Sequence, residues 1–190
     1  MRLFLAVDLP DSLRRALGDL QSRLRSKVMG WRWVRPEAIH LTVRFLGEVS
    51  EEEDAGHRAA WRRAAASCPR VRFSVGGTGV FPPRGAPRIL WAGVRALDPP
   101  DGLIRLAEAV EQAARAQGFR PETRPFRPHL TVARAERRGH SESPPESDRG
   151  ALGEIEAREI VLFRSRLDPR GARYTRLDAF PLMPPTDISA

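Results

Sequence analysis

The chain has 190 residues, which is long enough to bury the core of one compact domain, and its single cysteine, Cys68, excludes a disulfide framework and a CxxC metal site. The formal net charge is +8, and Lys27 is the only lysine among 32 basic residues. Guanidinium groups match the geometry of phosphate, but a GC-rich coding sequence gives the same bias toward arginine. The charge therefore supports an anionic substrate without establishing one.

The N-terminal segment contains an apolar run of only five residues, 3–7. This run is too short for the core of a signal peptide or for a membrane span, so it predicts a buried opening strand. With one cysteine and no such targeting segment, we expect a cytoplasmic protein with no membrane partner.

Apolar periodicity and turn residues predict the remaining elements. Leucines spaced four, three and four residues apart from Leu13 predict the first helix, and Ser50 and Asp101 are expected to cap the other two. The polar residues 136–150 predict an exposed loop, and those from Pro181 onward a frayed tail. In chain order, strands are predicted at residues 3–7, 31–34, 40–46, 71–80, 88–94, 129–132, 154–163 and 173–180, and helices at residues 11–28, 50–66 and 101–117.

One tetrapeptide, HLTV, occurs twice, at residues 40–43 and 129–132. In RPEAIHLTV and RPFRPHLTV six of nine positions agree, and the two copies lie nearly half the chain apart. A helix precedes each copy and strands surround it. We therefore predict a duplicated α+β unit, in which residues 1–190 form one domain of two interleaved lobes, each with a helix-covered sheet.

Alternate side chains of a strand share a face, so His40 and Thr42 point the same way, about 7 Å apart. The leucine and valine of the motif point into the lobe. His129 and Thr131 repeat this arrangement in the second copy. If a pseudo-twofold axis relates the lobes, two imidazoles and two hydroxyls line one cleft.

This arrangement suits the in-line cleavage of a phosphodiester. One imidazole acts as the base on the attacking oxygen and the other as the acid on the leaving oxygen, while the hydroxyls donate to the non-bridging oxygens. We expect no metal and no other cofactor, because the four histidines lack the spacing of metal ligands. A duplicated strand with a purely structural role is the alternative. Identical motifs cannot show which histidine is the acid.

At these residues the chain resembles the two-histidine (2H) phosphoesterase superfamily, which is marked by paired H-x-[ST]-hydrophobic motifs. Five segments are similar to the narrower family of RNA 2′,3′-cyclic phosphodiesterases, also called 2′-5′ RNA ligases: RLFLAVDLP, HLTVRFLGEV, RILWAGV, RPFRPHLTVAR and LFRSRLDPRGARYTRLDAFPL. The resemblance covers nearly the whole chain. It implies a bilobal α+β fold in which two antiparallel sheets face a central cleft, with helices on the outer faces.

The resemblance also implies the metal-independent hydrolysis of a terminal 2′,3′-cyclic phosphate on RNA to a 2′-phosphomonoester, and reversible 2′-5′ ligation of RNA such as tRNA halves. It implies that His40 is the proton donor to the leaving 3′ oxygen and that His129 is the proton acceptor that activates water. Thr42 and Thr131 would hold the phosphate, and Arg134 would contact it.

Other side chains near the motifs are candidates for substrate binding. Arg44 shares the face of the first motif threonine in an ideal strand, although a solvated arginine at the strand end is the alternative. Arg134 would point away from the second histidine unless a bulge re-aims it. Phe126 and Trp33 could stack a base, with core packing as their alternative.

Other functions stay open from the sequence. The same chemistry would serve a small substrate such as ADP-ribose 1″,2″-cyclic phosphate, which calls for a closed pocket and little dependence on salt, whereas RNA binding weakens steeply with salt. A non-catalytic RNA-binding module would have no need of two opposed imidazoles. A module that binds a phosphoryl group for regulation through an anchoring partner is a further alternative, and nothing in the sequence identifies such a partner. We expect a monomer, because no heptad or large apolar stripe is left over.

Overall fold

The computed structural model describes residues 1–136, 141–143, 150–166, 168 and 171–184. The three predicted helices form close to their expected positions, and the leucine stripe of the first is buried. In chain order the elements are β1 (Arg2–Val7), α1 (Asp11–Arg25), β2 (Trp31–Trp33), a 3-10 turn η1 (Pro36–Ala38), β3 (Leu41–Glu48), α2 (Glu51–Ala66), β4 (Val71–Phe81), β5 (Ile89–Asp98), α3 (Gly102–Ala116), β6 (His129–Ala135), β7 (Ala151–Ala157), β8 (Glu159–Arg166) and β9 (Arg173–Pro181).

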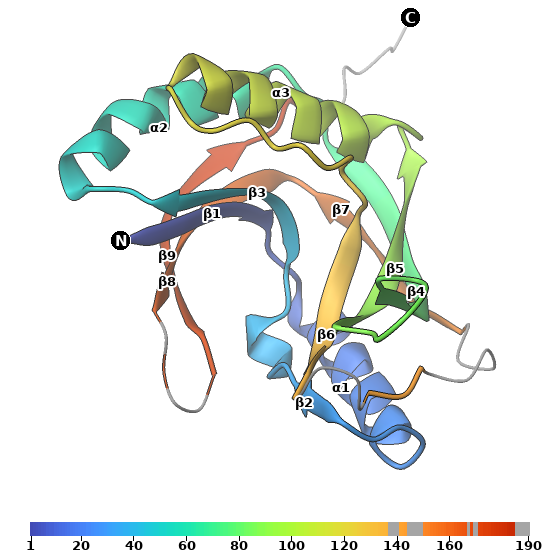
Figure 1. Ribbon diagram of the computed structural model, residues 1–190. Coiled ribbons are helices and arrows are strands. Elements are labelled where there is room, and N and C mark those ends of the chain that lie inside the picture. Colours follow the sequence, from blue (N-terminus) through green and yellow to red (C-terminus); the bar gives the residue numbers. More distant parts are fainter. Residues whose placement is uncertain (137–140, 144–149, 167, 169–170, 185–190) are drawn as a thin grey trace, which may run out of the picture.

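The strands form a strongly curved antiparallel sheet, shown in Figure 1. Their order is β7-β4-β5-β6-β3-β1-β8-β9, and β2 adds to β6. The half β7-β4-β5-β6 and the half β3-β1-β8-β9 meet at a single residue pair, Leu41 opposite Leu130. The predicted α+β class is confirmed, and the two expected sheets are the two halves of this one curved sheet.

The helices lie on the outer side of the curve, and each half is covered by a helix that follows a strand of the other half (Figure 1). Helix α1 follows β1 but packs behind β6, where Gln21 Nε2 donates to the carbonyl of Val132 at 2.8 Å. Helix α3 follows β5 but lies behind β3, where Glu111 Oε2 is 2.7 Å from Arg44 Nε. The two lobes are interleaved in this sense.

Strand β1 is buried on both faces because it lies inside its half of the sheet. Leu3, Leu5 and Val7 pack in the main core beneath the helices. Phe4 points to the inner side of the curve and packs with Phe163 in a separate small cluster. The inner face of this half therefore has an apolar floor of its own.

The segment predicted as one strand at residues 154–163 is two strands, and that prediction was wrong. β7 ends at Ala157 and pairs with β4, whereas β8 begins at Glu159 and pairs with β1 in the other half. The chain crosses from one half of the sheet to the other at this point. Apolar alternation cannot show such a change of partner, because both strands face a core.

The prediction of a frayed tail is wrong for its first residues, since Pro181 is the last residue of β9. Leu182 is buried, and the Met183 N–H donates to the carbonyl of Cys68 at 2.8 Å. Residues 185–190 of the predicted tail, and residues 137–140 and 144–149 of the predicted loop, lie outside the described part of the chain.

The expected cap of α3 takes a different form. Asp101 precedes the helix but makes no side-chain capping hydrogen bond, and its Oδ2 lies 2.6 Å from Arg105 Nε instead. The helix ends before Gly118, whose φ of 83° fits a glycine after a helix C-terminus. Within the residues that the structure describes, no helix combines the length and the apolar composition needed to cross a membrane.

Candidate active site

The two HLTV strands meet where the two halves of the sheet join. Since Leu41 lies opposite Leu130, the antiparallel register sets His40 across from Thr131 and His129 across from Thr42. The two histidines are then diagonal neighbours, which in a flat pair of strands lie about 7–8 Å apart. These two strands pair at this one residue pair only.

Both imidazoles are held by a backbone carbonyl two residues earlier in the chain. His40 Nδ1 lies 2.9 Å from the carbonyl oxygen of Ala38, and His129 Nδ1 lies 2.7 Å from that of Arg127. A carbonyl oxygen only accepts, so Nδ1 carries the hydrogen in each ring. Nε2 is therefore the nitrogen that gains or loses a proton in both histidines.

The pKa values of both imidazoles are lowered, mainly because burial disfavours the charged ring. The pKa of His40 falls from 6.5 to about 4, although the nearby Asp8 carboxylate acts to raise it. The pKa of His129 is lowered as well. Burial raises the pKa of the Tyr174 phenol. The positive charge of Arg134 lowers the pKa of His40, His129 and Tyr174, which places its guanidinium near all three rings.

A β-bulge in β6 places Arg134 on the inner face. Thr131 and Ala133 pair with consecutive residues of β5, which leaves Val132 as the extra residue. Val132 and Ala133 are both fully buried beneath the helices, and Arg134 is exposed. From the sequence, Arg134 is expected to face His129 only if a bulge re-aims it, and this bulge is present. Contact between Arg134 and substrate stays a prediction.

The same bulge occurs at the same place in β3 and removes Arg44 from the cleft. Thr42 and Arg44 pair with neighbouring residues of β1, so Val43 is the extra residue. Arg44 is 9% exposed and pairs with Glu111 of α3 at 2.7 Å. The prediction that Arg44 shares the face of Thr42 is therefore wrong, because strict alternation holds only in a strand without a bulge. The residue that reaches the inner face is Phe45.

The predicted stacking residues lie against the main core. Phe126 and Trp33 are partly buried and pack against it, and the Trp33 ring also lies 5.5 Å from the Arg25 guanidinium carbon. The ring that contacts His129 is that of Phe81, edge-on at 5.1 Å between centroids. Phe81 is the last residue of β4, directly before the connection to β5, and no motif distinguished it. Base stacking by Phe126 stays a prediction.

Two aromatic rings that were not expected beside His40 surround it; Tyr174 lies in the closing segment of the resemblance, where structural hydrogen bonding was its expected role. Phe4 stacks on the imidazole at 4.6 Å between centroids, and Tyr174 meets it edge-on at 5.0 Å. Period-two alternation in β1 could have found Phe4, since it places this ring opposite the side of Leu3 and Leu5. Tyr174 comes from β9, far along the chain, and only the fold brings it to His40.

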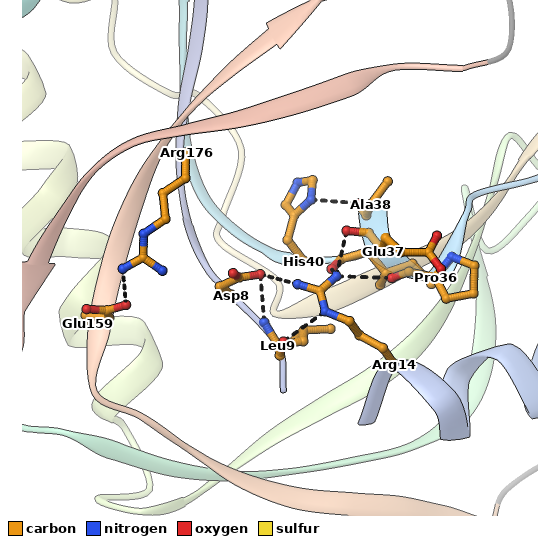
Figure 2. Close-up of polar contacts among 10 residues, drawn as sticks. Asp8, Leu9, Arg14, Pro36, Glu37, Ala38, His40, Glu159 and Arg176 are labelled. Atoms are coloured by element: carbon orange, nitrogen blue, oxygen red, sulfur yellow. Dashed lines mark hydrogen bonds and ion pairs between the residues drawn. The ribbon is translucent and has the colours of Figure 1, made fainter. Parts of the chain in front are cut away.

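A partly buried arginine, Arg14, organises the turn that precedes His40, as Figure 2 shows. Arg14 of α1 donates through Nη1 to the carbonyl of Glu37 at 2.6 Å and through Nη2 to the Asp8 carboxylate. It also donates to three further backbone carbonyls of the two segments that it joins. The same turn presents the carbonyl of Ala38 to His40. Arg14 thereby fixes both the acceptor for His40 Nδ1 and the negative charge nearby.

Comparisons with known proteins agree with this geometry. The family model described as LigT like Phosphoesterase matches residues 7–91 and 96–174. An RNA 2′,3′-cyclic phosphodiesterase of Thermus thermophilus is 38% identical over 191 residues, which cover 96% of this chain and 90% of that protein. One of Archaeoglobus fulgidus is 37% identical over 187 residues, which cover 95% and 99%.

Solved structures of high similarity cover almost the whole fold. TT0787 of Thermus thermophilus superposes with a TM-score of 0.80 at 36% identity, over 96% of this chain and 98% of that one. E. coli LigT complexed with 3′-AMP has a TM-score of 0.75 at 29% identity, over 95% and 97%. Similarity of sequence and of fold therefore extends over nearly the whole of this chain in both comparisons.

Proposed function

We propose a function for this chain from its family: it belongs to the LigT-like phosphoesterases. It is an enzyme that hydrolyses the terminal 2′,3′-cyclic phosphate of an RNA to a 2′-phosphomonoester. The observation that carries the proposal is a pair of imidazoles on adjoining strands, each with Nδ1 fixed by a carbonyl and Nε2 free. Relatives that match over nearly the full chain and are named for this activity support it.

The proposed reaction is an in-line displacement at phosphorus. His129 Nε2 takes a proton from water while the water oxygen forms its bond to phosphorus. The bond from phosphorus to the 3′ oxygen breaks, and His40 Nε2 gives its proton to that oxygen. Thr42, Thr131 and Arg134 donate to the non-bridging oxygens, where negative charge is concentrated in the transition state. The same acid and base would run 2′-5′ ligation if a 5′ hydroxyl replaced water as the nucleophile, because the 3′ oxygen is the leaving group in both reactions.

The lowered pKa of His40 raises the question of how this histidine can act as the acid. The pKa of His40, the expected acid, is lowered to about 4, so this ring is neutral at pH 7 before substrate arrives. A phosphate anion beside it acts in the opposite direction, as the Asp8 carboxylate does. In the proposed mechanism, His40 takes up its proton together with the substrate.

A substrate in which sulfur replaces the 3′ oxygen separates the acid from the base, because a thiolate leaves without being protonated. We expect His40→Ala to recover most of its lost rate on this substrate and His129→Ala to stay inactive. Recovery by His129→Ala, with no recovery by His40→Ala, would reverse the two roles.

An RNA substrate is favoured by the charges beside the cleft. Arg32 of β2 lies opposite Arg134 in the β2–β6 pair, and both residues are exposed. Two guanidinium groups side by side can follow the phosphates of a chain, which a small cyclic phosphate lacks. We expect KM for a short RNA to rise steeply with salt, and KM for a cyclic mononucleotide to change less. That the RNA is a tRNA fragment, and that the enzyme acts as a cytoplasmic monomer, stay predictions.

The test of the proposed function is the turnover of a short RNA with a 2′,3′-cyclic phosphate end, in the presence of EDTA. We expect a 2′-phosphate product, and we expect the activity to be lost in both His40→Ala and His129→Ala. A folded wild-type protein that leaves this RNA intact would contradict the proposal and favour a small cyclic phosphate or a binding module. Loss of activity with EDTA, restored by a metal ion, would contradict the metal-independent mechanism.

A further inference from the structure

The side chain of Phe45 is an aromatic ring that the fold leaves exposed at the cleft. It is 56% exposed, although its neighbours in β3 on the helix side are buried. Its position follows from the bulge at Val43, so Phe45 is the counterpart of Arg134 in the other repeat. The two copies of HLTV are identical, but the first inner-face residue beyond each bulge differs in chemistry.

The ring of Phe45 belongs to a cluster that reaches the catalytic histidine. The ring centroid of Phe45 lies 5.9 Å from that of Phe4, and the centroid of Phe4 lies 4.6 Å from that of His40. Phe4 is itself buried and also contacts Phe163 and Tyr174. Phe45 is thus the exposed end of a rigid aromatic floor, and a flat apolar partner can cover its ring without displacing core residues.

The in-line reaction determines the side of the cleft on which the nucleoside lies. The leaving 3′ oxygen is opposite the attacking water, so a ribose whose 3′ oxygen is protonated by His40 lies on the half that contains β3. Thr42 and Phe45 are successive residues on the inner face of that strand, about 7–10 Å apart along it. This separation matches the span from the phosphate of a nucleotide to its base.

We propose that Phe45 is the platform on which the base of the terminal nucleotide stacks. Arg134 then binds the phosphate side of the substrate and Phe45 the base side, which orients the substrate in a cleft that is otherwise nearly symmetric. Stacking accepts every base because each has a π face, so the site would favour purines modestly over pyrimidines and exclude none. This inference rests on the proposed function, including the assignment of His40 as the acid.

The test compares Phe45→Leu and Phe45→Trp with wild type on two substrates, adenosine 2′,3′-cyclic phosphate and ribose 2,3-cyclic phosphate, which lacks the base. For Phe45→Leu we expect kcat/KM on the adenosine substrate to fall about tenfold, mostly through KM. On the substrate without a base, Phe45→Leu and wild type should be equal. Phe45→Trp should keep or improve the wild-type KM for adenosine.

Two further variants serve as controls. Ile104→Ala changes an apolar side chain on α3 that is 39% exposed and lies away from the cleft, and it should leave both substrates unaffected. Phe81→Leu removes the ring beside His129 and should lower the rate on both substrates alike. A loss in Phe45→Leu that is equal on both substrates, or no loss at all, would overturn the proposal. So would a base-dependent loss in Phe81→Leu alone.

Binding of the product keeps this test separate from the proposed function. Adenosine 2′-monophosphate should bind Phe45→Leu about tenfold more weakly than wild type by calorimetry, whereas ribose 2-phosphate should bind both equally. If wild type binds the nucleotide in this way but turns over neither cyclic phosphate, the proposed reaction fails while the stacking site stands. If Phe45→Leu binds adenosine 2′-monophosphate as wild type does, the stacking site is excluded.

Discussion

The two halves of the cleft share a tetrapeptide, a bulge and a carbonyl that holds a histidine, yet they provide different surroundings. His40 lies between Phe4 and Tyr174, and its pKa is lowered to about 4. His129 has an edge contact with Phe81, and burial lowers its pKa as well. The duplication supplies two equivalent Nε2 atoms, and the neighbours supplied by other strands make them inequivalent. An acid and a base with different pKa values require such a difference.

Removing either imidazole tests whether both halves are needed. We expect His40→Ala and His129→Ala each to lower kcat on a 2′,3′-cyclic substrate by about 10²–10⁴. The double variant should be little worse than the poorer single variant, because the two groups act in one step. Steady-state rates of the four proteins check this. A single variant with nearly full activity would show that one half of the cleft is structural.

Arg134 is the second residue after the bulge in its strand and Arg44 is the first after the bulge in the other strand. We therefore expect replacement of Arg134 to affect substrate binding and replacement of Arg44 to affect stability. Arg134→Gln removes a charge at the cleft and should raise KM about 10–100-fold, with little effect on unfolding. Arg44→Gln leaves Glu111 without its buried partner and should lower the free energy of unfolding by about 1–3 kcal/mol, with kcat and KM near wild type. Kinetics and urea unfolding of both variants check this. The reverse pattern would mean that the bulges are not where the structure has them.

The buried His40 makes the fold sensitive to acid. Its pKa in the folded chain is about 4, below the ordinary 6.5, so the unfolded chain binds the proton more readily between these values. The contribution of neutral His40 to the free energy of unfolding, up to about 3 kcal/mol, is complete above pH 6.5 and is lost as the pH falls through 4. Urea unfolding at pH 7 and pH 4.5 should show a smaller loss in His40→Asn than in wild type. An equal loss in the two proteins would contradict this contribution of His40.

Arg14 organises only the His40 half and offers a milder test of the asymmetry. Arg14→Met frees the turn that presents the Ala38 carbonyl, so we expect kcat to fall about tenfold while KM changes little. The rate with a 3′-sulfur substrate should fall much less, since that reaction does not need the acid. Arg14→Lys should recover part of the activity through the Asp8 contact. An equal loss on the oxygen and sulfur substrates would assign Arg14 a structural role alone.

The positions of the motif histidines and threonines could be predicted from the repeated tetrapeptide, because period-two alternation depends on local sequence only. The residues beyond the bulges were not predictable in the same way. LTVRF and LTVAR contain no glycine or proline to mark an extra residue, so Arg44 was placed on the wrong face and Phe45 was overlooked. Local patterns also cannot show that α1 covers the half of the sheet that contains β6, or that Tyr174 reaches His40. Such contacts between distant segments arise from the topology of the sheet.

The dependence of kcat on pH tests the paired action of the two imidazoles most directly, because kcat reports the pKa values of the enzyme–substrate complex, in which His40 holds its proton. Wild type should give a bell-shaped profile between pH 5 and 9 on an RNA with a 2′,3′-cyclic end, since one ring must be neutral and the other charged. The residual activity of His129→Ala should lose the acid limb, and that of His40→Ala the alkaline limb. A monotonic wild-type profile, or variants that keep both limbs, would contradict acid–base catalysis by this pair.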